Sequence, residues 1–154
     1  MRKVRGSLSL VVGAVAIALA CAKAPEAGDD PTGSVTSASS LVGPRWRLVE
    51  LEGQPAIAMT GSREPHLIFS RSDTAARVGG ATGCNSMGGS YQADGTGLRF
   101  SGLFSTKMAC VEEDRMRQET AFLNALNAVD RYAVSGDTLL LSAGDRVVAK
   151  FVKS

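Results

Sequence analysis

The chain has 154 residues and a formal net charge of +2, with 44% hydrophobic, 21% charged and 5% aromatic residues. Part of the positive charge lies in the first five residues, and residues 44–154 alone hold 13 Lys and Arg against 12 Asp and Glu. These charges are dispersed and form no basic stripe. The composition therefore argues against a nucleic-acid partner and against an electrostatic patch for a membrane surface.

The N-terminus combines a basic start with a short apolar run. Arg2, Lys3 and Arg5 precede residues 8–20, which carry no charge. As a helix this run would be about 20 Å long, which is shorter than the roughly 30 Å hydrocarbon core of a membrane. Residues 1–20 are therefore predicted to be a secretory signal peptide rather than a permanent membrane span.

Small residues at the end of the apolar run predict where this signal peptide is removed. Ala18 and Ala20 stand where signal peptidases require small side chains, which places the cleavage between Ala20 and Cys21. The stretch 17–21 resembles a bacterial lipobox, although Ala18 stands where Leu is favoured. We expect a lipoprotein-type signal peptide, with Cys21 as the lipid attachment site and the membrane as its partner. An ordinary signal peptide with an incidental cysteine is the alternative.

The segment 21–43 is rich in Ala, Gly, Ser, Thr, Pro and Asp. It has too few bulky apolar residues to offset the entropy of ordering, so a lipid-anchored flexible linker is expected. Ala22 follows the cysteine where inner-membrane lipoproteins usually carry Asp. We therefore expect an exported protein of the cell envelope, on the outer membrane and facing the periplasm if the organism has one.

The remaining residues 44–154 have the common size of a single domain. Trp46 and Leu48 alternate with charged residues, as in a strand with one buried face. Turn-forming residues such as Gly95 and Gly136 separate further short runs, and the last three runs are expected to form a meander. The predicted strands span residues 46–51, 66–69, 76–79, 90–93, 97–100, 131–134, 138–141 and 147–152.

One segment has helical periodicity. Residues 112–129 contain no Gly or Pro, and acidic residues begin the segment, where a helix dipole favours negative charge. The expected fold class is therefore α+β, with one α-helix packed against a curved, partly barrel-like antiparallel sheet. The apolar stripe of this helix is expected to contain Met116, Phe122, Leu123, Leu126 and Val129.

Two cysteines lie inside the predicted domain. Cys84 stands in the stretch 79–91, which holds five glycines and is expected to be a Gly-rich turn, and Cys110 directly precedes the helix. In an exported protein we expect these thiols to form a disulfide. Closing a loop of about 26 residues would stabilise the domain by roughly 3.5 kcal/mol.

Two short motifs hold these cysteines in a specific pattern. Gly83, Cys84 and Asn85 form the first motif, and Thr106-x-Met108-Ala109-Cys110 forms the second, followed by the acidic start of the helix. In order and spacing, residues 44–154 resemble the META domain (HslJ-like) family. Other matching elements are Trp46-x-Leu48, Leu67-x-Phe69, Gly89-x-Tyr91, Leu98-x-Phe100 and Gly136-Asp137-x-Leu139-x-Leu141.

The resemblance implies a compact α+β domain that is often carried on secreted or lipid-anchored bacterial proteins. Members of the family are linked to heat shock, to antibiotic tolerance and, in some parasites, to motility and virulence. No established catalytic activity and no cofactor comes with the resemblance. The seven motif residues from Gly83 to Cys110 are thus expected to mark the module rather than a reaction.

Enzymatic and metal-binding interpretations find little support in the sequence. Cys84 could act as a nucleophile with His66, the only histidine, as its base, but a structural disulfide accounts for both internal cysteines. Ser62 and Ser86 lack the context of a nucleophile elbow. The glycines lack the Lys-Ser or Lys-Thr of a phosphate-binding loop, and one histidine with two paired cysteines makes no zinc site. Asn85 is expected to bond the local backbone of its turn.

The sequence therefore favours a non-enzymatic envelope lipoprotein associated with stress tolerance or envelope integrity, with no metal and no cofactor. Its expected partner besides the membrane is an envelope protein or a small apolar ligand. One alternative is a lipid- or peptide-binding periplasmic chaperone of the pilotin type. A hydrolase or an inhibitor-type protein that uses His66 or the Gly-rich turn is the other.

Overall fold

The computed structural model describes residues 38–59, 63–108 and 111–154. The segment before residue 38, which includes the predicted signal peptide and most of the predicted linker, lies outside the described residues. The helices are α1 (Ala38–Leu41) and α2 (Glu113–Ala128). The strands are β1 (Arg45–Leu51), β2 (Gln54–Pro55), β3 (His66–Arg71), β4 (Ala76–Ala81), β5 (Ser86–Asp94), β6 (Gly97–Ser105), β7 (Arg131–Ser135), β8 (Thr138–Ala143) and β9 (Arg146–Lys153).

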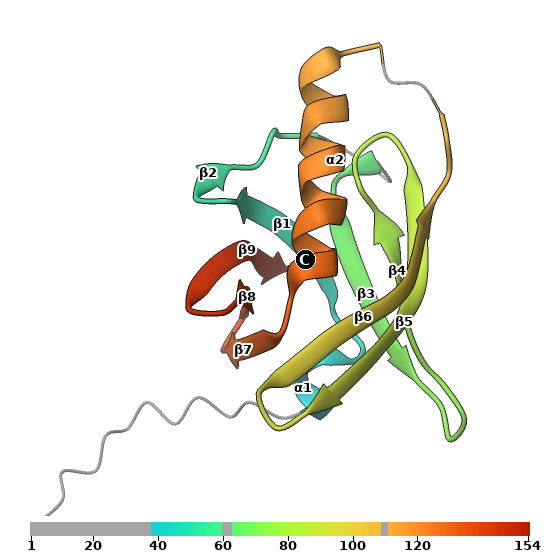
Figure 1. Ribbon diagram of the computed structural model, residues 1–154, viewed down its shortest axis with the longest axis vertical. Coiled ribbons are helices and arrows are strands. Elements are labelled where there is room, and N and C mark those ends of the chain that lie inside the picture. The colour runs from blue at the N-terminus through green and yellow to red at the C-terminus, as the bar shows by residue number, and fades with distance from the viewer. Residues whose placement is uncertain (1–37, 60–62, 109–110) are drawn as a thin grey trace, which may run out of the picture. The chain divides into compact units, whose positions relative to one another are not determined.

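The strands form one antiparallel sheet that closes into a ring (Figure 1). Their order is β2-β1-β3-β4-β5-β6-β7-β8-β9, and β1 also pairs with β9. The junction between β6 and β7 is short, with a single pair of Cα partners, Gly97 and Arg131. Helix α2 packs against β6, β1 and β9. The fold is therefore α+β, with a curved antiparallel sheet and one main helix, as expected from the sequence.

The alternating strand patterns predicted the buried faces of the sheet. In β1, Trp46 and Leu48 are buried, and a register shift between Leu48 and Glu50 then brings Leu51 inward. Each of the eight predicted strands is present, and β7, β8 and β9 form the expected meander. The two-residue strand β2 had no sequence signal, because a strand this short has no measurable periodicity.

The main helix begins and ends within one residue of its predicted bounds. Phe122, Leu126 and Val129 are buried in the core, whereas Met116 at the first stripe position is 45% exposed. Glu119, which was not expected to be buried, lies on the inner side of the helix together with Ala125. The acidic first turn is as predicted, with Glu113 and Asp114 near the positive end of the helix dipole.

The folded unit starts before Pro44, at the end of the segment that the composition predicted to be linker. Leu41 is fully buried and its carbonyl oxygen accepts a hydrogen bond from Trp46 Nε1 at 2.9 Å. The backbone N–H of Gly43 donates to Phe69 at 3.3 Å. Two apolar residues, Leu41 and Val42, between small residues are too weak a signal to reveal this docking, because its stabilisation depends on β1 and β3.

The Gly-rich stretch is only in part a turn. Its first two glycines belong to β4 and its last two to β5, so the turn itself is limited to residues 82–85. Close packing explains the strand glycine Gly80, because a Cβ added there would lie 2.0 Å from the carbonyl oxygen of His66. The expectation that the whole stretch 79–91 is a Gly-rich turn is therefore wrong.

Candidate functional site

The side chain of Asn85 joins three parts of the chain. Its Nδ2 donates to Glu119 Oε1 on α2 at 2.7 Å and to the carbonyl oxygen of Met108 at 3.2 Å. Its Oδ1 accepts from the backbone N–H of Met108 at 2.7 Å and from Thr106 Oγ1 at 2.8 Å. With only 6% of its surface exposed, Asn85 uses both donor hydrogens and both acceptor lone pairs. We call Thr82, Asn85, Thr106, Met108 and Glu119 the Asn85 cluster.

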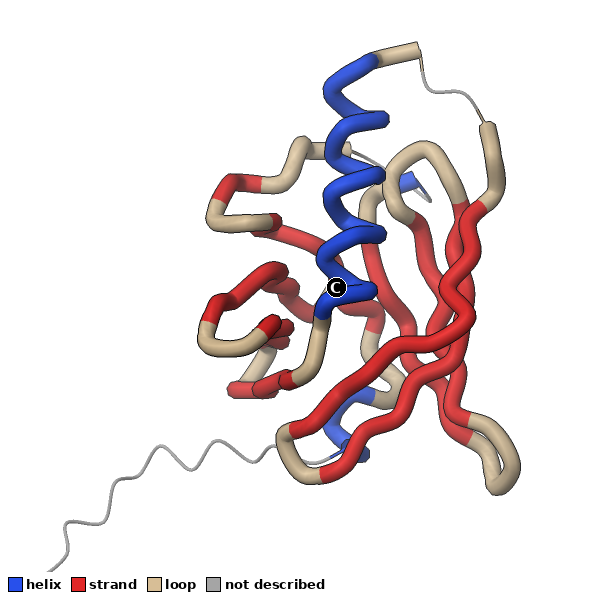
Figure 2. Tube along the Cα trace, in the orientation of Figure 1, coloured by secondary structure: helices blue, strands red, loops and turns tan. Residues whose placement is uncertain are grey.

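Backbone contacts hold the turn that presents Asn85. The N–H and the hydroxyl of Thr82 both donate to the carbonyl oxygen of Asn85, at 2.8 and 3.0 Å. The N–H of Ser86 donates to Thr106 Oγ1, and the N–H of Thr106 donates to the carbonyl oxygen of Ser86. Figure 2 shows that the β4–β5 turn and the segment after β6 lie at the same end of the sheet ring. The cluster therefore holds residues 106–108, which follow β6, against the β4–β5 turn and α2.

The structure brings both sequence motifs together. Gly83, Cys84 and Asn85 stand in the β4–β5 turn, against Thr106 and Met108. The expectation that the Asn85 side chain bonds the local backbone of its turn is wrong, since its partners lie 21 to 34 residues away. Ala109 and Cys110, together with Ala20 and Cys21 of the predicted lipidation site, lie outside the described residues. The Cys84–Cys110 disulfide therefore stays a prediction.

Glu119 is the member of the cluster that sequence reasoning missed. It is 9% exposed, and its Oε2 is buried without a hydrogen-bond partner. A signal was present, because Glu119 lies three residues before Phe122 and seven before Leu126, within the apolar stripe of the helix. A charged residue at such a position needs a buried polar partner, and Asn85 supplies it.

Cys84 lines two small cavities. One has a volume of about 200 Å³, and the other about 220 Å³. Both are lined by Arg63, Cys84 and Met108, and the first also by Met59 and Val111. Their surface is mixed, because the methionine and valine side chains lie beside the charged side chains of Arg63, Glu112 and Arg115. The cavities are too small for most cofactors, which need about 300 Å³ or more.

His66 lies at the start of β3, with 9% of its surface exposed. Its Nδ1 hydrogen bonds to the carbonyl oxygen of Glu64 at 2.7 Å, and Arg45 Nη2 lies 3.3 Å from the same nitrogen. Burial is the main cause that lowers the pKa of His66, with a smaller contribution from Arg45. The N–H of Ser86 is bound to Thr106, and Ser62 lies outside the described residues. No described hydrogen bond links His66 to a serine hydroxyl.

Metal-binding and membrane-spanning features were also sought in residues 38–59, 63–108 and 111–154. These ranges hold no group of three or more His, Cys, Asp or Glu side chains placed to share a metal ion. None of the helices described there has both the length and the apolar character to cross a membrane.

The described residues form a small α+β domain in which one helix packs against a closed ring of antiparallel strands. The buried Asn85 joins the helix to the ring, so the two motifs stabilise the fold. The chain belongs to the META domain family, whose model matches residues 39–154. The match begins within α1, in agreement with the buried position of Leu41.

Two solved structures share this fold. An NMR structure of a protein from Burkholderia xenovorans has a TM-score of 0.59 and 29% identity, covering 75% of this chain and 85% of its own. A second NMR structure has a TM-score of 0.60 and 17% identity, covering 75% of this chain and 94% of its own. Comparison with curated proteins gives no significant match.

Proposed function

We propose that this protein is a lipid-anchored envelope protein whose META domain acts by binding rather than by catalysis. The observation that carries the proposal is the order of elements along the chain. A lipobox-like stretch ends at Cys21, a polar segment follows, and the described domain begins at Ala38. A cysteine with two or three acyl chains is a stable anchor. The flexible polar segment would let the domain extend away from the lipid surface.

Contacts of the motif residues argue against a catalytic role for these residues. The side chains of Asn85 and Thr106 form hydrogen bonds with each other, and Asn85 also bonds the backbone of Met108 and Glu119 on α2. A catalytic group needs a free polar atom directed at a substrate. The motifs thus stabilise the domain, and the association with stress tolerance or envelope integrity rests on the family.

A disulfide between Cys84 and Cys110 is part of the same proposal. Met108, two residues before Cys110, is held to Asn85 by two hydrogen bonds. Val111, the residue after Cys110, lines the same cavity as Cys84 and Met108. These contacts support the pairing, because Met108 and Val111 stand two residues before and one residue after Cys110 in the sequence. Export to an oxidising compartment would then close the bond.

Intact-mass measurement of the protein from membranes tests the anchor. The wild type should carry the mass of a diacylglycerol and an acyl chain on a chain that starts at Cys21. Cys21→Ser should abolish this modification, and globomycin, which blocks the lipoprotein signal peptidase, should leave the signal peptide attached. Cys84→Ser is the matched control and should remain lipidated. A wild-type mature chain with an unmodified Cys21 would refute the anchor.

A further inference from the structure

An apolar row crosses the outer face of the sheet ring, the face turned away from the core. Ile68 on β3 lies opposite Gly79 on β4, which lies opposite Gly88 on β5. Gly88 in turn lies opposite Phe104 on β6. Phe69, the residue after Ile68, is buried in the core, so strand alternation turns this row outward. Ile68 is 40% exposed and Phe104 is 65% exposed.

Two glycines leave the middle of this row without side chains. A Cβ added at Gly88 would lie 2.7 Å from Phe104 Cζ, so the phenyl ring leans over β5 from β6. A Cβ added at Gly79 would meet only the carbonyl oxygen of Met87, at 3.9 Å. The row thus presents the side chains of Ile68 and Phe104 on an otherwise bare stretch of sheet. Single exposed apolar residues are ordinary, so the meaning of this row depends on the charges beside it.

Two exposed arginines lie beside the apolar row. Arg77 on β4 is opposite Ser90, and Arg99 on β6 is opposite Gln92. Ser90 and Gln92 follow the β5 glycine of the row by two and four residues, so alternation keeps both arginines on the outer face. Neither arginine belongs to an ion pair among the described residues. Within β3, β4, β5 and β6 the only acidic residue is Asp94, at the end of β5.

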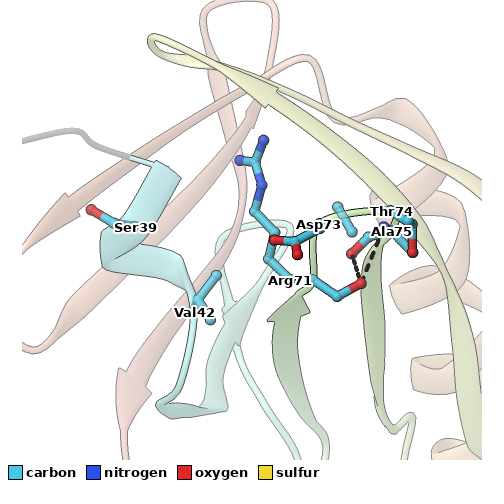
Figure 3. A pocket seen from close by; sticks show the side chains of 8 residues that line it. Ser39, Val42, Arg71, Asp73, Thr74 and Ala75 are labelled. Carbon is cyan, nitrogen blue, oxygen red and sulfur yellow. Dashed lines mark hydrogen bonds between the residues drawn. The ribbon is translucent and has the colours of Figure 1, made fainter.

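The chain enters the domain next to two of these strands. Val42, just after α1, lines one cavity together with residues 71–76 of the hairpin that joins β3 to β4. Figure 3 shows α1 beside this hairpin, with the Arg71 side chain between the two. Residues 22–37 of the predicted linker would have a typical end-to-end distance of roughly 22 Å. A lipid anchor at Cys21 would therefore keep β3 and β4 close to the lipid surface.

We propose that the outer face of β3, β4, β5 and β6 docks on the anionic lipid surface that holds the anchor. Phe104 and Ile68 enter the boundary between headgroups and acyl chains, and Arg77 and Arg99 contact lipid phosphates. These charges are dispersed along the sequence and form no basic stripe there, and only strand pairing places the two arginines beside the apolar row. The inference rests on the proposed anchor for its location, but the contact itself does not require the anchor.

Vesicle sedimentation of an unlipidated mature chain tests this face separately from the anchor. Residues 21–154 with Cys21→Ser keep the whole hydrophobic core, which lies between Leu41 and Phe151. We expect this chain to bind vesicles of equimolar phosphatidylglycerol and phosphatidylcholine at least about tenfold more strongly than vesicles of phosphatidylcholine alone. Raised salt should remove the difference, because it screens the attraction between exposed charges.

The arginines are tested with the double variant Arg77→Gln/Arg99→Gln. Each arginine near an anionic surface strengthens binding about fivefold, so the pair should weaken vesicle binding at least about tenfold. Arg117→Gln/Arg146→Gln is the matched control, because it removes the same charge from exposed positions on α2 and β9. This control should bind vesicles within about twofold of the chain with both arginine pairs intact.

The apolar row is tested with Phe104→Ser, which should weaken vesicle binding several-fold. Val147→Ser is its control, because Val147 is 40% exposed on β9, outside this face. No preference of the unlipidated chain for phosphatidylglycerol would overturn the proposal. Equal weakening by the two double variants, or by the two serine variants, would overturn it as well. An unmodified Cys21 in the intact-mass measurement would refute the anchor instead, and the vesicle result does not depend on it.

Discussion

Asn85 Nδ2 lies 2.7 Å from Glu119 Oε1, and this contact joins the turn between β4 and β5 to the middle of α2. The two residues are 34 positions apart in the chain and are both largely buried. Because the same asparagine also holds Thr106 and Met108, the turn, the segment after β6 and the helix form one polar network. Loss of this residue should therefore affect all three segments together.

Asn85→Ala should lower the free energy of unfolding by about 3 kcal/mol, because it leaves the buried Glu119 Oε1 and the part-buried backbone of Met108 without their hydrogen-bond partner. Urea unfolding measures this change. Asn127→Ala is the matched control, since Asn127 is an exposed residue on the same helix that bonds only Leu123. Its effect should be within about 0.5 kcal/mol. Similar losses in both variants would contradict a structural role for the Asn85 cluster.

Gly80→Ala should be far more destabilising than Gly79→Ala. The Cβ added at Gly80 would lie 2.0 Å from the carbonyl oxygen of His66, whereas at Gly79 the nearest atom is 3.9 Å away. The strand backbone must move to relieve the first contact, at a cost of about 1–3 kcal/mol or more. Thermal unfolding of the two variants gives the comparison. Equal midpoints would show that β3 and β4 are less closely packed at this pair than described.

Leu41→Ala tests where the domain begins. Leu41 is fully buried in the hydrophobic core, so truncation should cost about 2–5 kcal/mol. Met116→Ala is a suitable control, because Met116 is 45% exposed and lies outside the core. Denaturant unfolding would measure both variants. If Leu41→Ala were as mild as the control, residues 38–43 would belong to the linker after all.

His66 should make the domain less stable in mild acid. Its pKa in the folded state lies below the ordinary value of 6.5, chiefly through burial, so the unfolded chain binds protons more readily. Stability due to the neutral imidazole is therefore complete above about pH 6.5 and falls as the pH drops towards the folded-state pKa. Urea unfolding of wild type and His66→Gln between pH 8 and pH 5 measures the difference. Parallel pH profiles for the two proteins would refute this assignment.

Removal of the predicted disulfide should cost about 3.5 kcal/mol in the oxidised protein. If Cys84 and Cys110 are bonded, Cys84→Ser, Cys110→Ser and the double variant should be destabilised almost equally, since each removes the same bond. A reducing agent should lower the unfolding midpoint of the wild type and leave the variants unchanged. Two titratable thiols in the unfolded wild-type domain without reductant would contradict the bond.

Local patterns were sufficient for most of the sheet and for α2. A strand such as β1 shows its buried face directly, because Trp46 and Leu48 alternate with charged residues. The same reasoning misassigned the strand glycines, because glycine has no side chain whose alternation could be seen. It also misplaced Met116 and Glu119, since a helix stripe indicates which positions share a face and not which partner each position meets.

The sequence by itself determined the features that depend on neighbouring residues: the order of strands and helix, the α+β class and the pairing of two short motifs that marks a META domain. It also carries the lipobox-like stretch at Cys21, which lies outside the described residues. Only the tertiary structure decided the roles of Leu41, Asn85 and Glu119. Their partners are far away in the chain, and a buried hydrogen bond or a core contact exists only once the ring has closed around it.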